Sequence, residues 1–567
     1  MPRVRTPLEV EDLELSLDFI RFVINLNDSS TVLRRAHRRA PENVLKWSKS
    51  QAELWDTRIR RGEGREVLRE LQQVAVRLIP PSERTFYAQL VRRVGRPDLG
   101  LASLSKTARP FLKNQTDQVE FRDLMVEYAI CMQRLGGRRQ ALQLLKRSDL
   151  ASSPEGQLGQ AFVFMSEWDY EAAEQILRVV LSNPELSEYQ RQIARLNLFA
   201  SRVAMDALRE DGESDLFTHL QNFDEELVRS KSIRLQAAVR ELEAQLAIAR
   251  SNWKAALRAL DRAQEILRAD PSAGGHLLTK WQMIYQTSQT GNFADLRKYK
   301  DRCLERGLWE IARDTDFHLL LFQFDARRAD YLWAGTPYPH YRRRIEALLR
   351  RQQQSRIASS RSHQRAWEPP ESAYEWGYSG PVFHVERGFF RGKTLLEPGS
   401  RTFALLRTVL TDFYRPQPNL ALFGELYPNE SFDPISSPLR IRQLLASARR
   451  ALKQIPMHLL TTRDGIRVVK ETQLILRLDL QPLVELESEK LRSGSDRASV
   501  RLSRLKESFG EREFSSQEAC EVLRLSQPSL FRLMQTGLER GELSSRGDGR
   551  GRRYRFLSKS VGLRTAR

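Results

Sequence analysis

Apolar residues recur at spacings of three and four from about residue 8 to residue 350. That spacing places them along one side of an α-helix, whereas a strand would require strict alternation. Short breaks that contain Gly, Pro or Asn separate each apolar segment from the next. The pattern therefore predicts that residues 1–350 form an α-helical domain in which one helix follows another.

A weak repeat runs through this helical region. Small or turn residues followed by a helix rich in Ala and Leu recur in segments marked by Gly95, Gly136, Trp168, Trp253 and Phe293. The intervals are 41, 32, 85 and 40 residues, so one unit between Trp168 and Trp253 goes unrecognised. Repeats built from pairs of helices have periods of this size.

Two of these segments resemble the tetratricopeptide repeat. The first matches at Trp168, Tyr170, Ala172, Ala173 and Pro184, and the second matches at Trp253, Ala255, Ala256 and Pro271. The small Ala pair lets neighbouring helices approach closely, and a proline ends a helix because it has no amide donor. The resemblance implies an N-terminal α-solenoid of tetratricopeptide-like helix pairs. A generic α-solenoid is the alternative, because the period drifts.

The pattern changes after Arg351. Residues 351–380 are rich in Gln, Ser, Arg and Pro and have no periodicity, which predicts a basic flexible linker. Residues 381–482 then read as short strands, three helices and a hairpin. The strands lie in "HVERGFFRGKTLLEP", Ser400 caps the first helix, and "HLLTTRDGIRVV" predicts a hairpin that turns at Asp464-Gly465.

This order resembles the winged helix of the OmpR/PhoB type. The positions that match are Phe403, Leu405 and Leu406 in the first helix, Leu426 and Tyr427 in the second, Leu445, Arg449 and Leu452 in the recognition helix, and 462–468 in the wing. Gly465-Ile466 departs from the Gly-Tyr that the family usually carries. The resemblance implies contacts to phosphates or to a DNA groove by Arg440, Arg442, Gln443, Ser447 and Arg450.

A second small unit is predicted over residues 496–558. Ser515 or Ser516 can cap a helix that ends at Leu523, and Ser526 can cap the next. In that second helix Leu530, Leu533, Met534, Gly537 and Leu538 form one stripe. The segment "ELSSRGDGRGRRYRF" predicts a β-hairpin in which Tyr554 and Phe556 point inward while Arg553 and Arg555 point outward.

A helix pair followed by a basic hairpin resembles the winged helix-turn-helix of the MarR type. The resemblance implies that Gln527, Ser529, Arg532 and Thr536 lie near base edges or phosphates, and that Arg550, Arg552 and Arg553 reach the backbone or the minor groove. Residues 559–567 form a basic tail. The Gly547-x-Gly549-x-Gly551 spacing is not a phosphate loop, because it lacks the following helix and the Walker lysine.

The net charge of +20 is located in three short segments. Residues 340–367 hold eight Arg against one Glu, residues 438–453 hold four Arg and one Lys, and residues 522–567 hold ten Arg and one Lys against three acids. Positive charge gathered in this way is typical of proteins that bind a polyanion. Double-stranded DNA is the expected partner.

The rest of the composition excludes several classes of protein. Cys131, Cys303 and Cys520 are far apart, so neither a zinc site nor a disulfide framework is indicated. We find no catalytic signature, and we expect neither an enzyme nor a cofactor. The densest apolar stretch, residues 317–324, is too short for a membrane span, and the N-terminus does not resemble a signal peptide, so a cytoplasmic location without membrane contact is expected.

The sequence thus predicts a mainly α cytoplasmic transcriptional regulator. Its helical repeats would bind a protein or a small-molecule effector, and two small α+β winged-helix domains would hold DNA. The alternative is a scaffold or adaptor whose repeats and winged helices bind protein partners or RNA. The sequence leaves a homodimer open, because winged-helix proteins often dimerise but no coiled-coil heptad is present.

Overall fold

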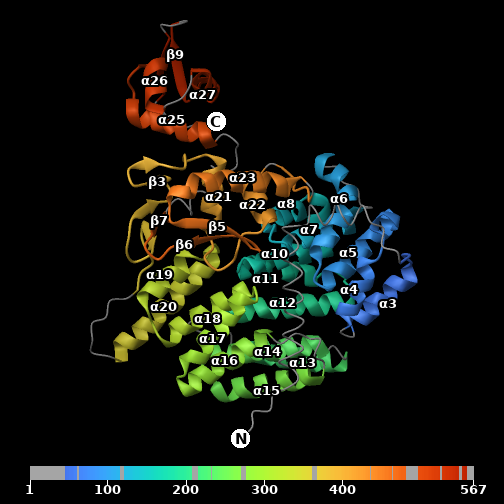
Figure 1. Cartoon of the computed structure of the whole chain (residues 1–567). Coiled ribbons are helices and arrows are strands. Elements are labelled where there is room, and N and C mark those ends of the chain that lie inside the picture. The colour runs from blue at the N-terminus through green and yellow to red at the C-terminus, as the bar shows by residue number, and fades with distance from the viewer. Residues whose placement is uncertain are drawn as a thin grey trace, which may run out of the picture.

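The computed structural model describes residues 45–557, apart from 61–62, 115–120, 185, 207–214, 231–232, 270–275, 360–366, 429, 435, 463, 481–495, 524–526 and 548–551. This part of the chain is mainly helical, as predicted, and its strands form small sheets that begin after residue 372 (Figure 1). None of the described helices combines the length and the apolar character that a membrane span requires.

The N-terminal helices, which we call the helical region, end at residue 359 (Figure 1). Their bounds are α3 Lys49–Arg60, α4 Gly64–Gln72, α5 Arg84–Arg93, α6 Pro97–Asn114, α7 Arg122–Arg134, α8 Arg138–Leu145, α9 Ser148–Ala151, α10 Pro154–Ser166, α11 Tyr170–Leu181, α12 Glu188–Asp206, α13 Leu216–Arg229, α14 Ile233–Ala249, α15 Trp253–Ala269, α16 His276–Thr290, α17 Phe293–Glu305, α18 Trp309–Phe322, α19 Ala326–Ala334 and α20 Pro339–Ser359.

One type of turn recurs between these helices. A residue with a left-handed backbone stands two positions before the next helix at Gly95, Gly136, Trp168, Ser251, Gly291 and Gly307. At five of them the following amide donates to the carbonyl five residues earlier, as Asn252 does to Ala247 at 2.8 Å. This is the Schellman ending of a helix, in which glycine is favoured. Five of these turns lie at, or two positions before, the residues that mark the weak pattern in the sequence: Gly95, Gly136, Trp168, Trp253 and Phe293.

Residues 373–479 form what we call the sheet–helix unit. Its elements are β1 Ala373–Trp376, β2 Val382–His384, β3 Phe389–Phe390, β4 Lys393–Thr394, α21 Arg401–Val409, α22 Asn419–Leu426, α23 Ser437–Ala451, β5 Met457–Thr462, β6 Gly465–Lys470 and β7 Ile475–Asp479. The strand order in the larger sheet is β1-β7-β2-β3-β4, and β5 pairs with β6 as the predicted hairpin. The sequence did not indicate strands β1 and β7; β7 pairs with β2, and β1 pairs with β7 at the edge of the sheet.

The segment predicted as a flexible linker, residues 351–380, needs correction at both ends. Residues 351–359 continue α20, and Ala373–Trp376 is strand β1. The indole of Trp367 is buried and donates to Asp330 Oδ1 at 2.9 Å. Burial of Trp367 anchors the chain here, which composition alone does not reveal.

The sheet–helix unit shares a hydrophobic core with the helical region. The shared core contains Tyr128 and Leu145 from the helices and Phe423 and Leu445 from the unit. A Cβ built on Gly137 would lie 2.2 Å from Leu420, so the start of α8 packs directly on α22. The core therefore crosses the boundary predicted at residue 381.

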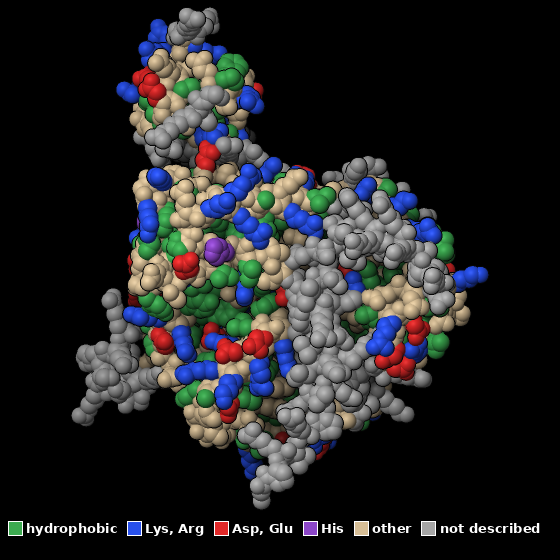
Figure 2. Space-filling model, in the orientation of Figure 1, with side chains coloured by type: hydrophobic (Ala, Val, Ile, Leu, Met, Phe, Trp, Pro, Cys, Tyr) green, Lys and Arg blue, Asp and Glu red, His purple; other side chains and the backbone are tan. Residues whose placement is uncertain are grey.

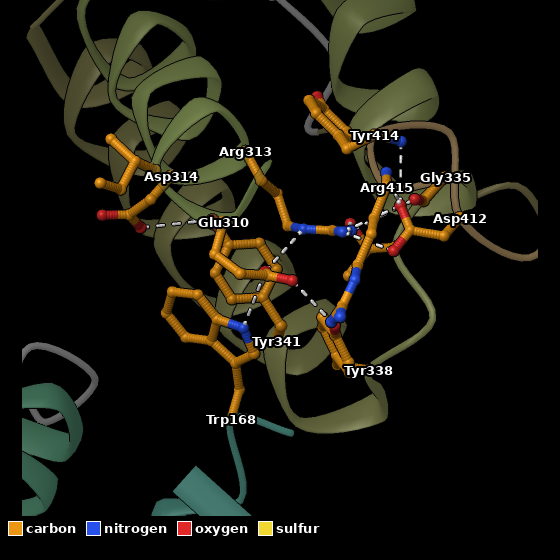
Figure 3. Close-up of polar contacts among 12 residues, drawn as sticks. Trp168, Glu310, Arg313, Asp314, Gly335, Tyr338, Tyr341, Asp412, Tyr414 and Arg415 are labelled. Atoms are coloured by element: carbon orange, nitrogen blue, oxygen red, sulfur yellow. Dashed lines mark hydrogen bonds and ion pairs between the residues drawn. The ribbon is translucent and has the colours of Figure 1, made fainter. Parts of the chain in front are cut away.

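A buried ion pair also joins these two parts (Figure 3). The Arg313 guanidinium donates through Nη2 to both Asp412 oxygens, at 2.9 and 2.8 Å, and through Nη1 to the Gly335 carbonyl at 3.2 Å. The Tyr338 and Tyr414 rings flank it at 5.1 and 4.9 Å. Burial alone would lower the pKa of Arg313, but the charges of Asp412 and Glu310 outweigh burial and raise it. The guanidinium therefore stays charged in the interior.

Residues 496–557 form a separate C-terminal unit with its own core (Figure 1). Its elements are α25 Asp496–Phe509, β8 Phe514–Ser515, α26 Ser516–Leu523, α27 Gln527–Glu539, β9 Leu543–Arg546 and β10 Arg553–Phe556. The strands pair antiparallel in the order β8-β10-β9. An ion pair at 2.6 Å between Arg501 of α25 and Glu397 connects this unit to the sheet–helix unit.

Several local predictions for the C-terminal unit are confirmed. Tyr554 and Phe556 are buried, while Arg553 and Arg555 are exposed. Of the two candidate caps for α26, Ser515 is the one used: its Oγ accepts from the Glu518 amide at 3.2 Å, and its own amide donates to Glu518 Oε2 at 2.7 Å. This reciprocal arrangement is a capping box. The other predicted cap, Ser526, lies outside the described residues.

Candidate nucleic-acid interface

Helix α23 buries one side and exposes the other. Ile441, Leu445 and Ala448 face the core. The five predicted contact residues of this helix are exposed or half-buried: Arg440, Arg442, Gln443, Ser447 and Arg450. Helical spacing places all of them except Arg442 on one outward face, with Arg442 at its flank. Figure 2 shows Lys and Arg side chains gathered along the face that α21 and α23 form.

Arg440 is held by its own unit. Its Nη2 lies 3.0 Å from Glu430 Oε1, its Nη1 donates to Glu430 Oε2, and its guanidinium stacks 3.9 Å from the centre of the Tyr427 ring. The hydrogen bond from Arg440 is the main cause of the lowered pKa of Glu430. The predicted DNA-contact residue Arg440 is therefore paired with a carboxylate in this structure.

Arg401 stands beside the same ring, and the sequence prediction missed it. Its guanidinium lies 4.7 Å from the centre of the Tyr427 ring, and its side chain is exposed at the start of α21. Arg401 precedes the basic segment 438–453 by almost forty residues, so a charge count along the chain does not join them. Its position just after the helix cap Ser400 was the one available signal.

Arg449, on the flank of α23, has a structural role. Its Nε and Nη2 donate to the Leu459 carbonyl at 2.9 and 2.7 Å, and Nη2 also donates to Thr461 Oγ1 at 2.7 Å. These bonds tie α23 to β5. Arg450, one residue later, is exposed. Its Nη2 donates a long hydrogen bond to Ser447 Oγ at 3.3 Å.

The tip of the β5–β6 hairpin, predicted as a wing over 462–468, packs against the rest of the molecule. Ile466 exchanges backbone hydrogen bonds with Gln417 at 2.8 and 2.9 Å, and both Gly465 and Ile466 are buried. A Cβ on Gly465 would lie 2.4 Å from the Gln417 carbonyl oxygen. Only glycine fits this close approach. The backbone bonds to Gln417 keep the hairpin tip packed against the rest of the sheet–helix unit.

In the C-terminal unit, α27 carries the predicted outward residues. Gln527 and Arg532 are exposed, while Ser529 and Thr536 are half-buried. Thr536 Oγ1 donates to the Arg532 carbonyl at 3.0 Å. The sequence prediction missed Phe531, which is 59% exposed beside Arg532. The outward face of α27 is therefore polar with one apolar ring.

The β9–β10 hairpin carries arginines that are engaged within the unit. Arg553 Nη1 lies 3.2 Å from Glu518 Oε2, and Arg552 Nη2 donates to Ser545 Oγ at 2.9 Å. Arg550 lies outside the described residues. Both Arg553 and Glu518 are well exposed, so water competes strongly for this pair.

The basic segment 340–367 needs a correction. Arg342 is buried and donates to the Trp333 and Ala334 carbonyls at 3.0 and 3.2 Å. Arg344 pairs with Asp314 at 3.1 Å. Part of the charge attributed to polyanion binding is therefore used inside the fold, where backbone carbonyls hold Arg342 and the Asp314 carboxylate pairs with Arg344.

A cavity of about 430 Å³ lies in the sheet–helix unit. Its lining includes Trp376, which stacks on Phe413, and the cationic side chains of Arg467 and Lys470. Burial lowers the pKa of Lys470. The volume is that of small-molecule sites. The cavity is not in the helical region, where the sequence placed an effector.

Comparison with known proteins found no family model that matches the chain and no similar curated protein.

Proposed function

We propose that the chain binds duplex DNA through two winged helices, the sheet–helix unit and the C-terminal unit, and that it acts as a transcriptional regulator. The observation that carries this proposal is common to both units. In each, a helix (α23 or α27) has its apolar side in the core and a polar side facing outward, with several arginines on α23 and Arg532 on α27. Such a helix can enter a major groove.

Phosphate contacts supply the affinity in this account. Exposed Arg450 and Arg532 reach phosphates, and each contact releases condensed counterions, so binding weakens as salt rises. Gln443 and Gln527 are exposed on the same helices and carry amide groups that can hydrogen-bond to base edges. Sequence selection therefore rests on a few neutral side chains, while most of the arginines act on the backbone.

The helical region acts as an α-solenoid that receives the regulatory signal, a protein or a small-molecule effector. The recurring Schellman turn supports this interpretation, since a fixed turn stacks successive helices in a regular way. The shared core and the Arg313–Asp412 pair imply that this region and the sheet–helix unit move as one body. An effector on the helices would thus alter whether the sheet–helix unit and the C-terminal unit can engage DNA together.

A titration of the full chain with labelled mixed-sequence duplexes at several salt concentrations tests this function. The full chain is required because the sheet–helix unit shares its core with the helices. We expect binding that weakens with salt, and Arg532→Ala combined with Arg553→Ala should lower the magnitude of the log–log salt slope by about two. Lys298→Ala, at a residue exposed on α17, is the control. Absence of binding at low salt would contradict the proposal.

A scaffold that binds protein partners or RNA is the second candidate. Exposed Phe531 on α27 favours it, because a large apolar ring on an outward helix face is common at protein interfaces. The same titration distinguishes the two functions when single-stranded RNA replaces the duplex. Tighter binding of RNA, or binding of neither polymer, favours the scaffold.

A further inference from the structure

Two arginines lie against the ring of Tyr427 in the sheet–helix unit, and Glu430 pairs with one of them. Arg401 begins α21, Arg440 lies in the first turns of α23, and Glu430 is in the connection between α22 and α23. The two guanidinium carbons lie 4.7 and 3.9 Å from the ring centre. Two cations therefore share one aromatic platform, which is a favourable site for them because the ring face is negative.

Both arginines lower the pKa of the Glu430 carboxyl group. Arg440 contacts both of its oxygens, and the charge of Arg401 acts on it as well, after the larger effect of the Arg440 hydrogen bonds. Arg401, Glu430 and Arg440 all reach solvent, because the side chains of the ion pair are 47% and 36% exposed and Arg401 is exposed. The carboxylate thus marks an accessible position for an anion beside two guanidinium groups.

We propose that Glu430 occupies the place of a DNA phosphate in the unbound chain, and that on binding a phosphodiester displaces it from Arg440 and also contacts Arg401. This inference rests on the proposed function. A phosphate offers guanidinium groups the same bidentate oxygen geometry as a carboxylate. The exchange is easy because an exposed ion pair contributes little free energy.

Glu430 then acts as a competitor built into the DNA-binding surface. A duplex must move this carboxylate away, so Glu430 weakens binding and favours sites with strong additional contacts. Tyr427 remains in place, since its ring is buried and stacks on Phe423 at 4.8 Å. The ring keeps the two guanidinium groups oriented when the carboxylate leaves.

The test compares the Glu430→Gln variant with the unchanged chain, both at full length, in duplex titrations read by fluorescence anisotropy. Glutamine keeps the shape and removes the charge, so we expect several-fold tighter binding at low salt and a salt slope steeper by about one. Arg401→Ala should weaken binding and reduce the slope by about one. Both changes are at exposed side chains, and circular dichroism checks that the fold is retained.

Glu375→Gln is the matched control. Glu375 pairs with Arg477 at 3.6 Å in the same unit, on β1 and β7, and its exposure is similar to that of Glu430. If Glu430→Gln binds no tighter than Glu375→Gln while the unchanged chain binds duplex, the phosphate site is wrong and the proposed function stands. If no form of the chain binds duplex at low salt, the proposed function fails and the phosphate site fails with it.

Discussion

Arg313 of α18 and Asp412, in the loop after α21, form a bidentate ion pair that is sealed from solvent, with side chains 0% and 1% exposed. The two residues are 99 positions apart in sequence and belong to the helical region and the sheet–helix unit. Asp412 also accepts the Tyr414 and Arg415 amides, each at 2.9 Å. The pair therefore fixes the geometry of the loop as well as the junction.

Asp412→Asn should destabilise the chain strongly. The change removes the closer of the two carboxylates that pair with the buried Arg313 and leaves only Glu310, at 3.2 Å, so we expect a cost of about 3 kcal/mol. Urea unfolding followed by circular dichroism measures the loss as a shift of the transition that includes the helical region. Glu375→Gln, at an exposed pair, should change the same transition by less than about 1 kcal/mol. If both substitutions lowered the free energy of unfolding equally, the buried pair would not be what holds the helical region and the sheet–helix unit together.

His318 should make the chain less stable in acid. Burial lowers its pKa to about 3, against about 6.5 in the unfolded chain. Because the folded state holds His318 neutral, unfolding takes up a proton below about pH 6.5, and stability falls with pH from there toward pH 3. Between about pH 7 and pH 5 the loss from this one group is about 2 kcal/mol.

The variant His318→Leu tests this pH dependence. It removes the titrating ring, so its free energy of unfolding should fall about 2 kcal/mol less than that of the unchanged chain over the same pH interval. His219→Gln, at an exposed histidine of α13, is the control and should keep the full dependence. An unaltered pH dependence in His318→Leu would mean that His318 is already charged in the folded chain.

The recurring turn gives opposite predictions at two sites. Ser251 has a left-handed φ of 56°, so Ser251→Gly should stabilise the chain by about 0.5–1 kcal/mol. Gly291 has a φ of 65° with open space around its Cα, so Gly291→Ala should destabilise by about 1 kcal/mol through the backbone alone. Thermal unfolding measures both, and changes of the same sign would refute the role of the turn.

Arg449 and Arg450 are adjacent and should behave differently. Arg449→Ala breaks the bonds from α23 to Leu459 and Thr461 and should lower stability by about 1–2 kcal/mol. Arg450→Ala should leave stability within about 0.5 kcal/mol and reduce the salt slope of DNA binding by about one. Urea unfolding and the duplex titration, made on both variants, separate the structural role of Arg449 from the DNA contact proposed for Arg450.

Local patterns in the sequence predicted much of the secondary structure. Apolar spacing of three and four gave the helices, and alternation placed Tyr554 and Phe556 inward. The serine before α26 indicated the helix start, and the structure selects Ser515. These features depend on neighbours within a few residues, so the local sequence is enough to predict them.

Contacts between distant segments were not accessible in this way. A count of charges cannot reveal that Arg344 pairs with Asp314 from another helix, or that Arg440 pairs with Glu430 across a loop. The linker prediction failed in part for the same reason, because β1 pairs with the distant strand β7 and a tertiary contact buries Trp367. The sequence predicted the helices of the candidate DNA face. It did not predict which carboxylates pair with the arginines of that face.

The salt dependence of duplex binding by the full chain tests the central claim most directly. The account predicts that the logarithm of the association constant falls linearly with the logarithm of salt concentration, with a slope that becomes shallower by about one for each of Arg401, Arg450 and Arg532 replaced by Ala. Binding that is absent at low salt, or a slope that none of these substitutions changes, would contradict it.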